Sequence, residues 1–410
     1  MKKNIEKYAQ LIIKKGINIQ KDQILVISAP VVTYDFTRQL VEEAYKAGAK
    51  EVVVHWGDEV VEKYRYAYAS DDVFDIFPNW KKESVDYYRK KGAAFLSIYA
   101  EDPEILKDVD KTRIARNKKA RGLALKEYYE AIMGNSNQWC VVSIPTTPWA
   151  KAIFPNESKE KAVEKLWTLI FKIMRVDKDD PVHEWDRHLQ NFRDTMGYLN
   201  SKKFVKLRYK NSLGTDLEIG LPQGHKWIGG SEKSKSGVEF IANMPTEEIF
   251  TLPDKYKVNG VVYSSKPLIF GGSKIDNFKL VFKDGKIVDF SAEVGEEVLE
   301  KVLTIDKNSK YLGEVALVPY DSPISKSGKV FYNTLYDENA SCHLAVGSAY
   351  PVCLEGAEEL SDKELEEKGV NISMNHVDFM IGTKDLEIVG IEPDGTEVQI
   401  MMDGNFVFTL

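Results

Sequence analysis

The stretch 23-QILVISAP-30 decides the fold of the N-terminal part of the chain. It is a short and almost continuous apolar run, which is typical of a strand buried on both faces of a sheet. Segments with helical periodicity flank it, and the same alternation continues afterwards. The expected helices are 3–16, 34–49, 84–91 and 112–133, and the further strands are 51-EVVVHW-56, 93-AAFLSIYA-100 and 138-QWCVVSIP-145. Strands that alternate with helices in this way predict a doubly wound parallel sheet covered on both faces.

After Lys203 the pattern changes to short alternating runs separated by turns, which is typical of antiparallel strands. Asp284-Gly285 lies between two such runs and indicates a hairpin, and a second hairpin is expected over 388–401. The stretch 228-IGGSEKSKSG-237 lacks the residue order of a phosphate-binding loop, so we expect a flexible surface loop there. The sequence therefore predicts an α/β protein with an N-terminal doubly wound parallel-sheet domain over 1–180, followed by a mainly antiparallel β (α+β) domain over 181–410.

Composition limits the classes of function. The chain has 410 residues, of which 43% are hydrophobic and 29% charged, as in ordinary globular proteins. Its net charge of −7 argues against general nucleic-acid binding, which normally shows a basic excess. The most apolar helix, 164–176, contains Lys172 and is too short to span a bilayer, so no membrane partner is expected. The three cysteines form no CxxC pair, which favours a reducing, cytoplasmic setting.

Among the six histidines, those of 183-HEWDRH-188 superficially resemble a zinc motif. They are five positions apart, which places them roughly 140° apart around a helix, so they do not share one metal ion. The stretch 375-NHVDFMIG-382 is different, because a strand would aim His376 and Asp378 from one face. Buried polar side chains need partners. Either Asp378 orients a structural histidine, or both residues bind a metal ion.

Three other stretches of the second half carry acids or histidine, namely 243-NMPTEEIFTLPD-254, 313-GEVALVPY-320 and 332-YNTLYDENASCHLAVGSAY-350. Each alone has a plain explanation as a solvated acid or a strand end. Two divalent ions, three carboxylates and one hydroxide would together be neutral, which suits a partly buried site. Mixed nitrogen and oxygen ligands favour Zn, Co or Mn over Ca. This arithmetic does not by itself select particular ligands from the 63 acidic residues of the chain. One set of three carboxylates and two imidazoles in the four stretches consists of Glu248, Glu314, His343, His376 and Asp378.

The blocks NMPTEEIFTLPD, GEVALVP, YDENASCHLAVGSAY and NHVDFMIG, in this order, resemble the aminopeptidase T/aminopeptidase S (PepS) family of dinuclear metallo-aminopeptidases. The resemblance covers the whole chain. It implies that the domain over 181–410 is the metal-binding catalytic domain and that the protein is a homodimer. The family pattern assigns the metal ligands to Glu248, Glu314, His343, His376 and Asp378, with the choice between Glu247 and Glu248 left open.

The resemblance implies a metal-dependent aminopeptidase that releases N-terminal residues from short peptides with a free N-terminus. Two divalent ions (Zn, Co, Mn or Mg) would activate a bridging hydroxide and polarise the scissile carbonyl. Glu338 is the candidate proton carrier and Tyr350 the candidate hydrogen-bond donor to the oxyanion, although a loop acid and a packing residue before Pro351 are equally simple interpretations. Two alternatives are a noncatalytic α/β ligand-binding protein and a dinuclear amidohydrolase or phosphoesterase that acts on small molecules.

Overall fold

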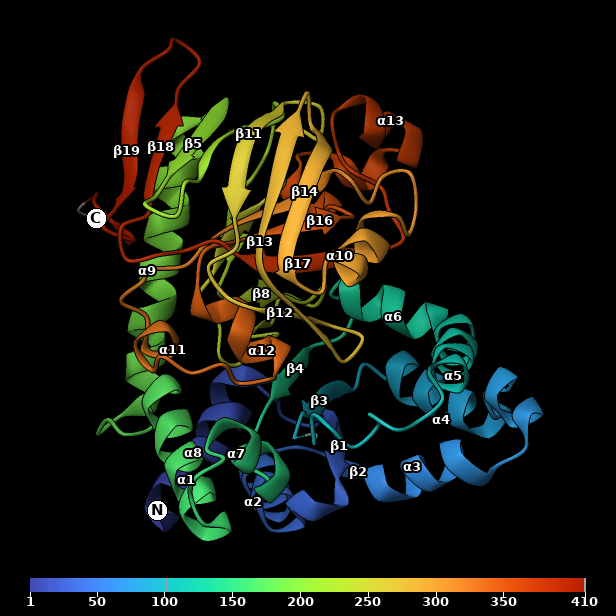
Figure 1. Cartoon of the computed structure of the whole chain (residues 1–410). Coiled ribbons are helices and arrows are strands. Elements are labelled where there is room, and N and C mark those ends of the chain that lie inside the picture. The colour runs from blue at the N-terminus through green and yellow to red at the C-terminus, as the bar shows by residue number, and fades with distance from the viewer. Residues whose placement is uncertain (101, 409–410) are drawn as a thin grey trace. The chain divides into compact units, whose positions relative to one another are not determined.

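The apolar runs of the N-terminal part form one parallel sheet in the computed structural model, which describes residues 1–100 and 102–408 (Figure 1). Its strands are β1 (Ile24–Pro30), β2 (Glu51–Gly57), β3 (Ala94–Ile98) and β4 (Trp139–Val142). Their order is β2–β1–β3–β4. The chain leaves β1 toward β2 on one side and then passes to β3 on the other, so right-handed crossovers place helices on both faces. The prediction of a doubly wound domain is confirmed.

The run 51–56 forms a strand as predicted, but this strand is less buried than β1. β2 lies at the edge of the sheet, and its residues are half-buried or exposed, including His55 at its end. An edge strand has a neighbouring strand on one side only. The apolar residues of the run 51–56 do not reveal that β2 lies at the edge of the sheet.

The helices of this part agree with the sequence pattern except at two places. The segment 112–133 is not one helix, because the chain breaks at Leu125, which is buried between two helices that face different surroundings. A helix that was not expected follows β2. No helix within the described ranges is long and apolar enough to cross a membrane. The helices are α1 (Lys2–Leu11), α2 (Tyr34–Lys46), α3 (Glu59–Tyr68), α4 (Asn79–Lys90), α5 (Lys111–Ala124), α6 (Lys126–Met133), α7 (Thr147–Ile153), α8 (Lys159–Ile173) and α9 (Pro181–Lys202).

The described residues divide into two compact units, each discontinuous in sequence. The first contains residues 1–188, 231–245 and 331–333, and the second contains residues 189–230, 246–330 and 334–410. The short hairpin of β8 (Glu232–Lys233) and β9 (Glu239–Phe240) therefore belongs to the first unit. The predicted division at residue 180 into separate domains stays a prediction.

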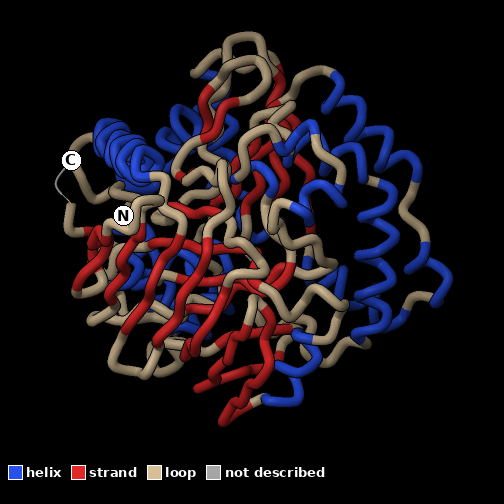
Figure 2. Tube along the Cα trace, turned by 90° about the horizontal axis from the view of Figure 1, so that it is seen from above, coloured by secondary structure: helices blue, strands red, loops and turns tan. Residues whose placement is uncertain are grey.

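The second unit is mainly antiparallel β, as expected, and Figure 2 shows strands that run side by side as a twisted sheet. One of its sheets has the order β17–β16–β15–β10–β7. The expectation of a loop over 228–237 is wrong at two places. Ile228 and Gly229 form β7 at the edge of this sheet, and Glu232 and Lys233 form β8 of the short hairpin. The strands are β7 (Ile228–Gly229), β10 (Ile249–Thr251), β15 (Leu312–Leu317), β16 (His343–Gly347) and β17 (His376–Met380).

A second sheet of this unit has the order β12–β13–β11–β6–β5–β18–β19–β20, with β14 paired to β13. Both predicted hairpins are present, and Asp284 and Gly285 adopt the positive φ angles of 48° and 85° that a tight hairpin turn requires. Figure 1 shows β11, β13 and β14 side by side. Helix α10 (Glu296–Leu303) follows β14. The strands are β5 (Lys206–Lys210), β6 (Asp216–Gly220), β11 (Val258–Tyr263), β12 (Leu268–Phe270), β13 (Ser273–Lys283), β14 (Lys286–Val294), β18 (Glu387–Ile391), β19 (Glu397–Met402) and β20 (Asn405–Phe406).

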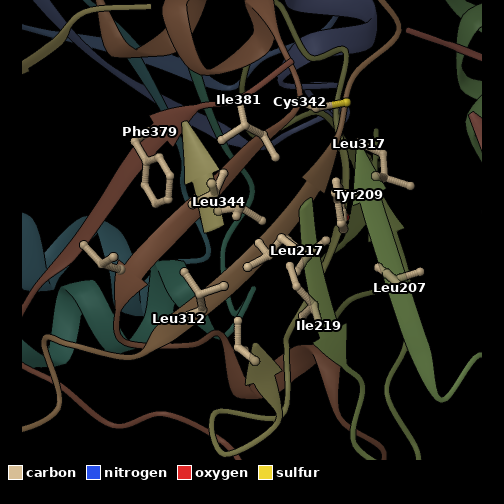
Figure 3. Packing of buried hydrophobic residues seen from close by; sticks show 14 of the residues in the cluster. Leu207, Tyr209, Leu217, Ile219, Leu312, Leu317, Cys342, Leu344, Phe379 and Ile381 are labelled. Atoms are coloured by element: carbon tan, nitrogen blue, oxygen red, sulfur yellow. The ribbon is translucent and has the colours of Figure 1, made fainter. Parts of the chain in front are cut away.

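The main core of the second unit lies between these sheets. Figure 3 shows apolar side chains of β5 and β6, such as Leu207 and Leu217, beside those of β15, β16 and β17. In β16 and β17 the side chains of Leu344 and Phe379 point into this core. Because side chains alternate along a strand, the residues between them point to the opposite face of the sheet. The core therefore fixes the register of the face that carries the candidate site.

The packing of Phe379 in this core predicts that truncation of its side chain strongly destabilises the protein. This side chain is 2% exposed, lies opposite Leu344, and its ring centroid is 5.7 Å from that of Phe278. Phe379→Ala should lower the free energy of unfolding by about 3–5 kcal/mol, through lost burial and a residual cavity. Chemical denaturation measures the change, with Val288→Ala, 57% exposed on β14, as the control that should change it by less than about 0.5 kcal/mol. Equal effects of the two substitutions would contradict this account of the core.

Candidate metal centre

The sheet β17–β16–β15–β10–β7 brings the predicted ligands together on one face. Glu314 lies on β15, His343 on β16, and His376 and Asp378 on β17, while Glu248 directly precedes β10. These five residues are far apart in sequence, so only the pairing of the strands makes them neighbours.

Small residues separate the ligand-type side chains on this face. Ala345 of β16 pairs with Glu314 on one side and with Asp378 on the other, so the three lie in one row across the sheet. Gly347 pairs with His376. Small side chains at these positions leave the space above the sheet to the carboxylates and imidazoles.

The ligand-type atoms form two groups that share one carboxylate. Among the described residues, Glu248, Glu314 and His343 form one group, and Glu314, His376 and Asp378 form the other. In each group the ligand atoms lie within 4.8 Å of one another. We call them the His343 group and the His376 group.

Glu314 reaches both groups with different oxygens. Its Oε1 lies 3.5 Å from Nε2 of His343, and its Oε2 lies 3.3 Å from Nε2 of His376. Each imidazole also faces a second carboxylate. Glu248 Oε2 is 3.2 Å from His343 Nε2, and Asp378 Oδ1 is 3.2 Å from His376 Nε2.

Backbone carbonyls fix which nitrogen of each histidine faces the carboxylates. Nδ1 of His343 lies 3.0 Å from the carbonyl oxygen of Ser341, and Nδ1 of His376 lies 2.7 Å from that of Ser348. A carbonyl oxygen only accepts hydrogen bonds, so each Nδ1 carries the proton and donates it. Nε2 is then left for a proton or a metal ion, which is the arrangement typical of metal-binding histidines.

The pKa directions show how strongly the carboxylates favour positive charge at both imidazoles. Burial alone would lower the pKa of His376, but Asp378 and Glu314 outweigh it and raise that pKa to about 11. Burial likewise opposes protonation of His343, yet Glu248 and Glu314 hold its pKa well above the ordinary value. Burial, together with the charges of Glu314 and Asp378, raises the pKa of Glu248. The site is therefore a buried negative cluster that requires protons or cations.

The donor set fits divalent metal ions. Three carboxylates and two imidazoles supply the oxygen and nitrogen ligands that Zn²⁺ and related ions take. Oδ1 of Asp378 is buried and faces Nε2 of His376 at 3.2 Å, so both atoms are placed to be ligands of one ion. The shared carboxylate and the two imidazoles suit a pair of ions better than a single one.

The two neighbouring acids, Glu247 and Glu248, have different surroundings. Glu248 faces His343, as described above, whereas the backbone N–H of Glu247 donates to Asn339 Oδ1 at 2.6 Å. Glu248 also shares its face of the strand with Phe250, two positions further on. Glu247 is buried and belongs to neither group.

The two predicted catalytic residues lie beside the groups. Glu338 begins a short 3₁₀ turn (Glu338–Ala340), and burial together with the charges of Glu248 and Asp378 holds its pKa well above the ordinary value. The ring of Tyr350 lies 4.7 Å from that of His376. Burial and the nearby carboxylates raise the pKa of Tyr350, so its hydroxyl stays protonated at neutral pH.

The remaining histidines of the sequence lie outside both groups. His183 and His188 are on α9, as expected, and His188 contacts Arg175. His225 lies in a loop, where its Nδ1 is 3.0 Å from the carbonyl oxygen of Pro222. Sequence reasoning missed the backbone partners Ser341 and Ser348. No residue-type signal marks a carbonyl, and Ser348 is 28 positions away from His376.

Comparisons with known proteins find relatives over almost the whole chain. The family model described as thermophilic metalloprotease (M29) matches residues 1–406. Aminopeptidase AmpS of Bacillus subtilis (strain 168) is 47% identical over 401 residues, which cover 98% of this chain and 98% of that protein. Aminopeptidase 2 of Geobacillus stearothermophilus is 45% identical over 408 residues, which cover 100% of this chain and 98% of that protein.

A solved structure extends the likeness to the fold. Wild-type AmpT from Thermus thermophilus matches with a TM-score of 0.93 and 39% sequence identity, over 99% of this chain and 100% of that one. Likeness over the full length, in sequence and in structure, confirms the family predicted from the four sequence blocks. The chain belongs to the M29 family of metalloproteases.

Proposed function

We propose that the protein is a metallo-aminopeptidase that releases N-terminal residues from short peptides with the help of two divalent metal ions. The observation that carries the proposal is the carboxylate of Glu314, which faces an imidazole with each of its oxygens. Membership of a metalloprotease family supports a peptidase, and the aminopeptidase names of the relatives support the exopeptidase activity.

The His343 group would hold one ion and the His376 group the other, with Glu314 common to both. Zn, Co, Mn and Mg remain the candidate metals, because mixed nitrogen and oxygen ligands suit the first three, and carboxylates suit the last. Ions bound there would supply a hydroxide nucleophile near neutral pH and polarise the scissile carbonyl.

Exposure gives the proposed direction of substrate approach. The side chains of His376 and Asp378 are the most exposed of the candidate ligands, at 21% and 20%, whereas those of Glu248 and His343 are 16% and 1% exposed. A substrate therefore reaches the cluster at the edge formed by His376 and Asp378, and we assign its free α-amine to this edge. An amine in a negatively charged site is favourable, and an acylated N-terminus would lose this interaction.

Glu338 and Tyr350 have the proposed roles in proton transfer and charge stabilisation. A carboxyl group whose pKa is raised binds a proton more readily than an ordinary carboxyl group does, so Glu338 would carry the proton from water to the leaving amine. Tyr350 keeps its proton because its pKa is raised, so its hydroxyl would donate a hydrogen bond to the developing oxyanion.

We also propose a cytoplasmic protein and a homodimer. The cysteines Cys140, Cys342 and Cys353 are free and buried, which agrees with a reducing compartment. The homodimer rests on the family resemblance of the sequence alone.

Metal dependence and the need for a free amine form the first test. Protein stripped with a chelator should regain activity with at least one of Zn²⁺, Co²⁺, Mn²⁺ or Mg²⁺ and should cleave leucyl-p-nitroanilide but not its N-acetyl form. Release of p-nitroaniline measures both reactions, and circular dichroism confirms that the stripped protein stays folded. Cleavage of both substrates would instead indicate a broader amidohydrolase, and cleavage of neither with any metal would favour a noncatalytic binding protein.

The shared carboxylate predicts unequal effects on metal content. Glu314→Gln should remove both ions because it changes both groups, whereas Glu248→Gln and Asp378→Asn should each remove one. Elemental analysis of purified protein measures the stoichiometry. Glu247→Gln, at the neighbouring acid outside both groups, is the matched control and should keep full metal content. A Glu314 variant that retains one ion would show that the two groups do not share this ligand.

The proposed catalytic roles predict losses in kcat without loss of metal. Glu338→Gln should lower kcat by about 10²–10⁴-fold because proton transfer is removed. Tyr350→Phe should lower kcat by about 10²–10³-fold because one oxyanion donor is lost. Steady-state kinetics and elemental analysis of the same preparations separate the two effects. An unchanged kcat in either variant would remove the role proposed for that residue.

A further inference from the structure

The turn that follows β16 contacts the imidazole of His376. Gly347 ends the strand with a φ angle of +105°, and a Cβ atom there would lie 2.2 Å from the carbonyl oxygen of Asn375. The next residue, Ser348, forms hydrogen bonds to residues 375–376 through both its N–H and its carbonyl. The N–H of Ser348 donates to the carbonyl of Asn375 at 2.6 Å, and the carbonyl of Ser348 accepts from Nδ1 of His376 at 2.7 Å. The direction of the Ser348 carbonyl therefore determines how the imidazole ring is held.

Asn371 holds this turn on both sides of Ser348. Its side chain is fully buried, and its Nδ2 donates to the carbonyl of Gly347 at 2.6 Å. Its backbone carbonyl accepts the N–H of Ala349 at 2.8 Å. The same Nδ2 also lies 3.0 Å and 3.2 Å from the carbonyl oxygens of Asn308 and Tyr311. Nδ2 of Asn371 thus contacts three carbonyl oxygens. The nearest belongs to Gly347, the residue before Ser348.

The arrangement of Asn371 is not the one that stability alone would select. Its Oδ1 is buried and accepts no hydrogen bond from the part of the chain that the structure describes. A buried acceptor without a partner destabilises a protein, so it requires an explanation. The bond to Gly347 supplies one, because it fixes the peptide group next to the carbonyl that His376 uses.

We propose that Asn371 is a positioning residue for His376, and that it sets the affinity of the His376 group for its divalent ion. It acts through the Gly347–Ser348 peptide: Asn371 holds the carbonyl of Gly347, and the carbonyl of Ser348 then holds Nδ1 of His376 with Nε2 aimed at Glu314 and Asp378. Partners of metal-binding histidines orient the ring and raise its basicity. The inference rests on the proposed metal-binding role of His376.

Asn308 provides a matched control. It is 8% exposed and belongs to the same polar region, but its Nδ2 donates to Glu366 Oε1 at 2.9 Å and to the carbonyl of Ile372 at 2.6 Å. Its side chain thus bonds to Glu366 and to the residue that follows Asn371, but not to the Gly347–Ser348 turn. The Asn308 variant therefore separates loss of the contact with the turn from a general disturbance of this polar region. Replacing either asparagine by alanine removes a buried amide of the same size, so a general loss of stability would affect both variants.

The experiment is a titration of the chelator-stripped, full-length protein with Zn²⁺ by calorimetry, without substrate. Wild-type protein should bind two ions. Asn371→Ala should weaken the binding of one ion by about 10–100-fold and leave the other unchanged. Asn308→Ala should bind both ions as wild-type protein does. Asn371→Ser, which keeps a shorter hydroxyl donor, should show a smaller loss, and it carries the test if the alanine variant does not fold.

A second measurement reports the histidine directly. The chain has six histidines, so selective ¹⁵N labelling of imidazoles resolves the Nδ1–H signal of His376. In wild-type protein this proton is hydrogen-bonded and protected from exchange, and Asn371→Ala should increase its exchange rate, whereas Asn308→Ala should not. If Asn371 had only a structural role, the exchange rate of this proton would change alike in the two variants.

Three results would overturn the inference. Folded Asn371 variants with both wild-type affinities would show that the turn does not depend on this amide. Equal weakening by Asn308→Ala would show a general effect of stability. Wild-type protein that binds no divalent ion would overturn the proposed function together with this inference, whereas the first two results leave the proposed function intact.

Discussion

The second unit depends on one interaction, in which the carboxylate of Glu314 lies between the imidazoles of His343 and His376. A buried carboxylate is costly unless it is paired and hydrogen-bonded, and Glu314 is 4% exposed. Its pairing with His343 and His376 requires three strands in one register, because a shift by one residue would turn the ligands into the core. The apolar residues on the opposite face, such as Leu344 and Phe379, hold that register. The core and the charged face are therefore two consequences of the same strand pairing.

The sequence predicted the parts of this arrangement that a short local pattern records. The run 23–30 and its helical neighbours indicated the parallel sheet, and the alternation of 375–382 placed His376 and Asp378 on one face. The edge position of β2 and the break at Leu125 were not predictable in the same way. Both depend on which other elements lie alongside, and a local apolar or polar pattern carries no such information.

The candidate ligands were found by family resemblance rather than by spacing. Glu248 and Asp378 are 130 positions apart, and no periodicity connects them; the strand register does so. The partners of the ligands are harder still to predict. His343 and His376 donate to the backbone carbonyls of Ser341 and Ser348, and a carbonyl looks the same at every position of a sequence. Asn371 and Asn339 can be read from the sequence, but their roles depend on the backbone groups with which they form hydrogen bonds.

The carboxylates that we propose as metal ligands attract protons when the metal is absent. With its pKa raised to about 11, His376 is charged at neutral pH in the metal-free chain. A group whose folded pKa exceeds its unfolded value stabilises the protein fully below the unfolded pKa, and this contribution is lost as pH rises through the folded pKa. For His376 the loss extends from about pH 6.5, the ordinary value, toward pH 11. Metal binding must displace this proton, so metal ions compete best where the proton is released most easily, at higher pH. Protons and metal ions thus neutralise the same buried cluster, and the fold tolerates three neighbouring carboxylates because one or the other is always available.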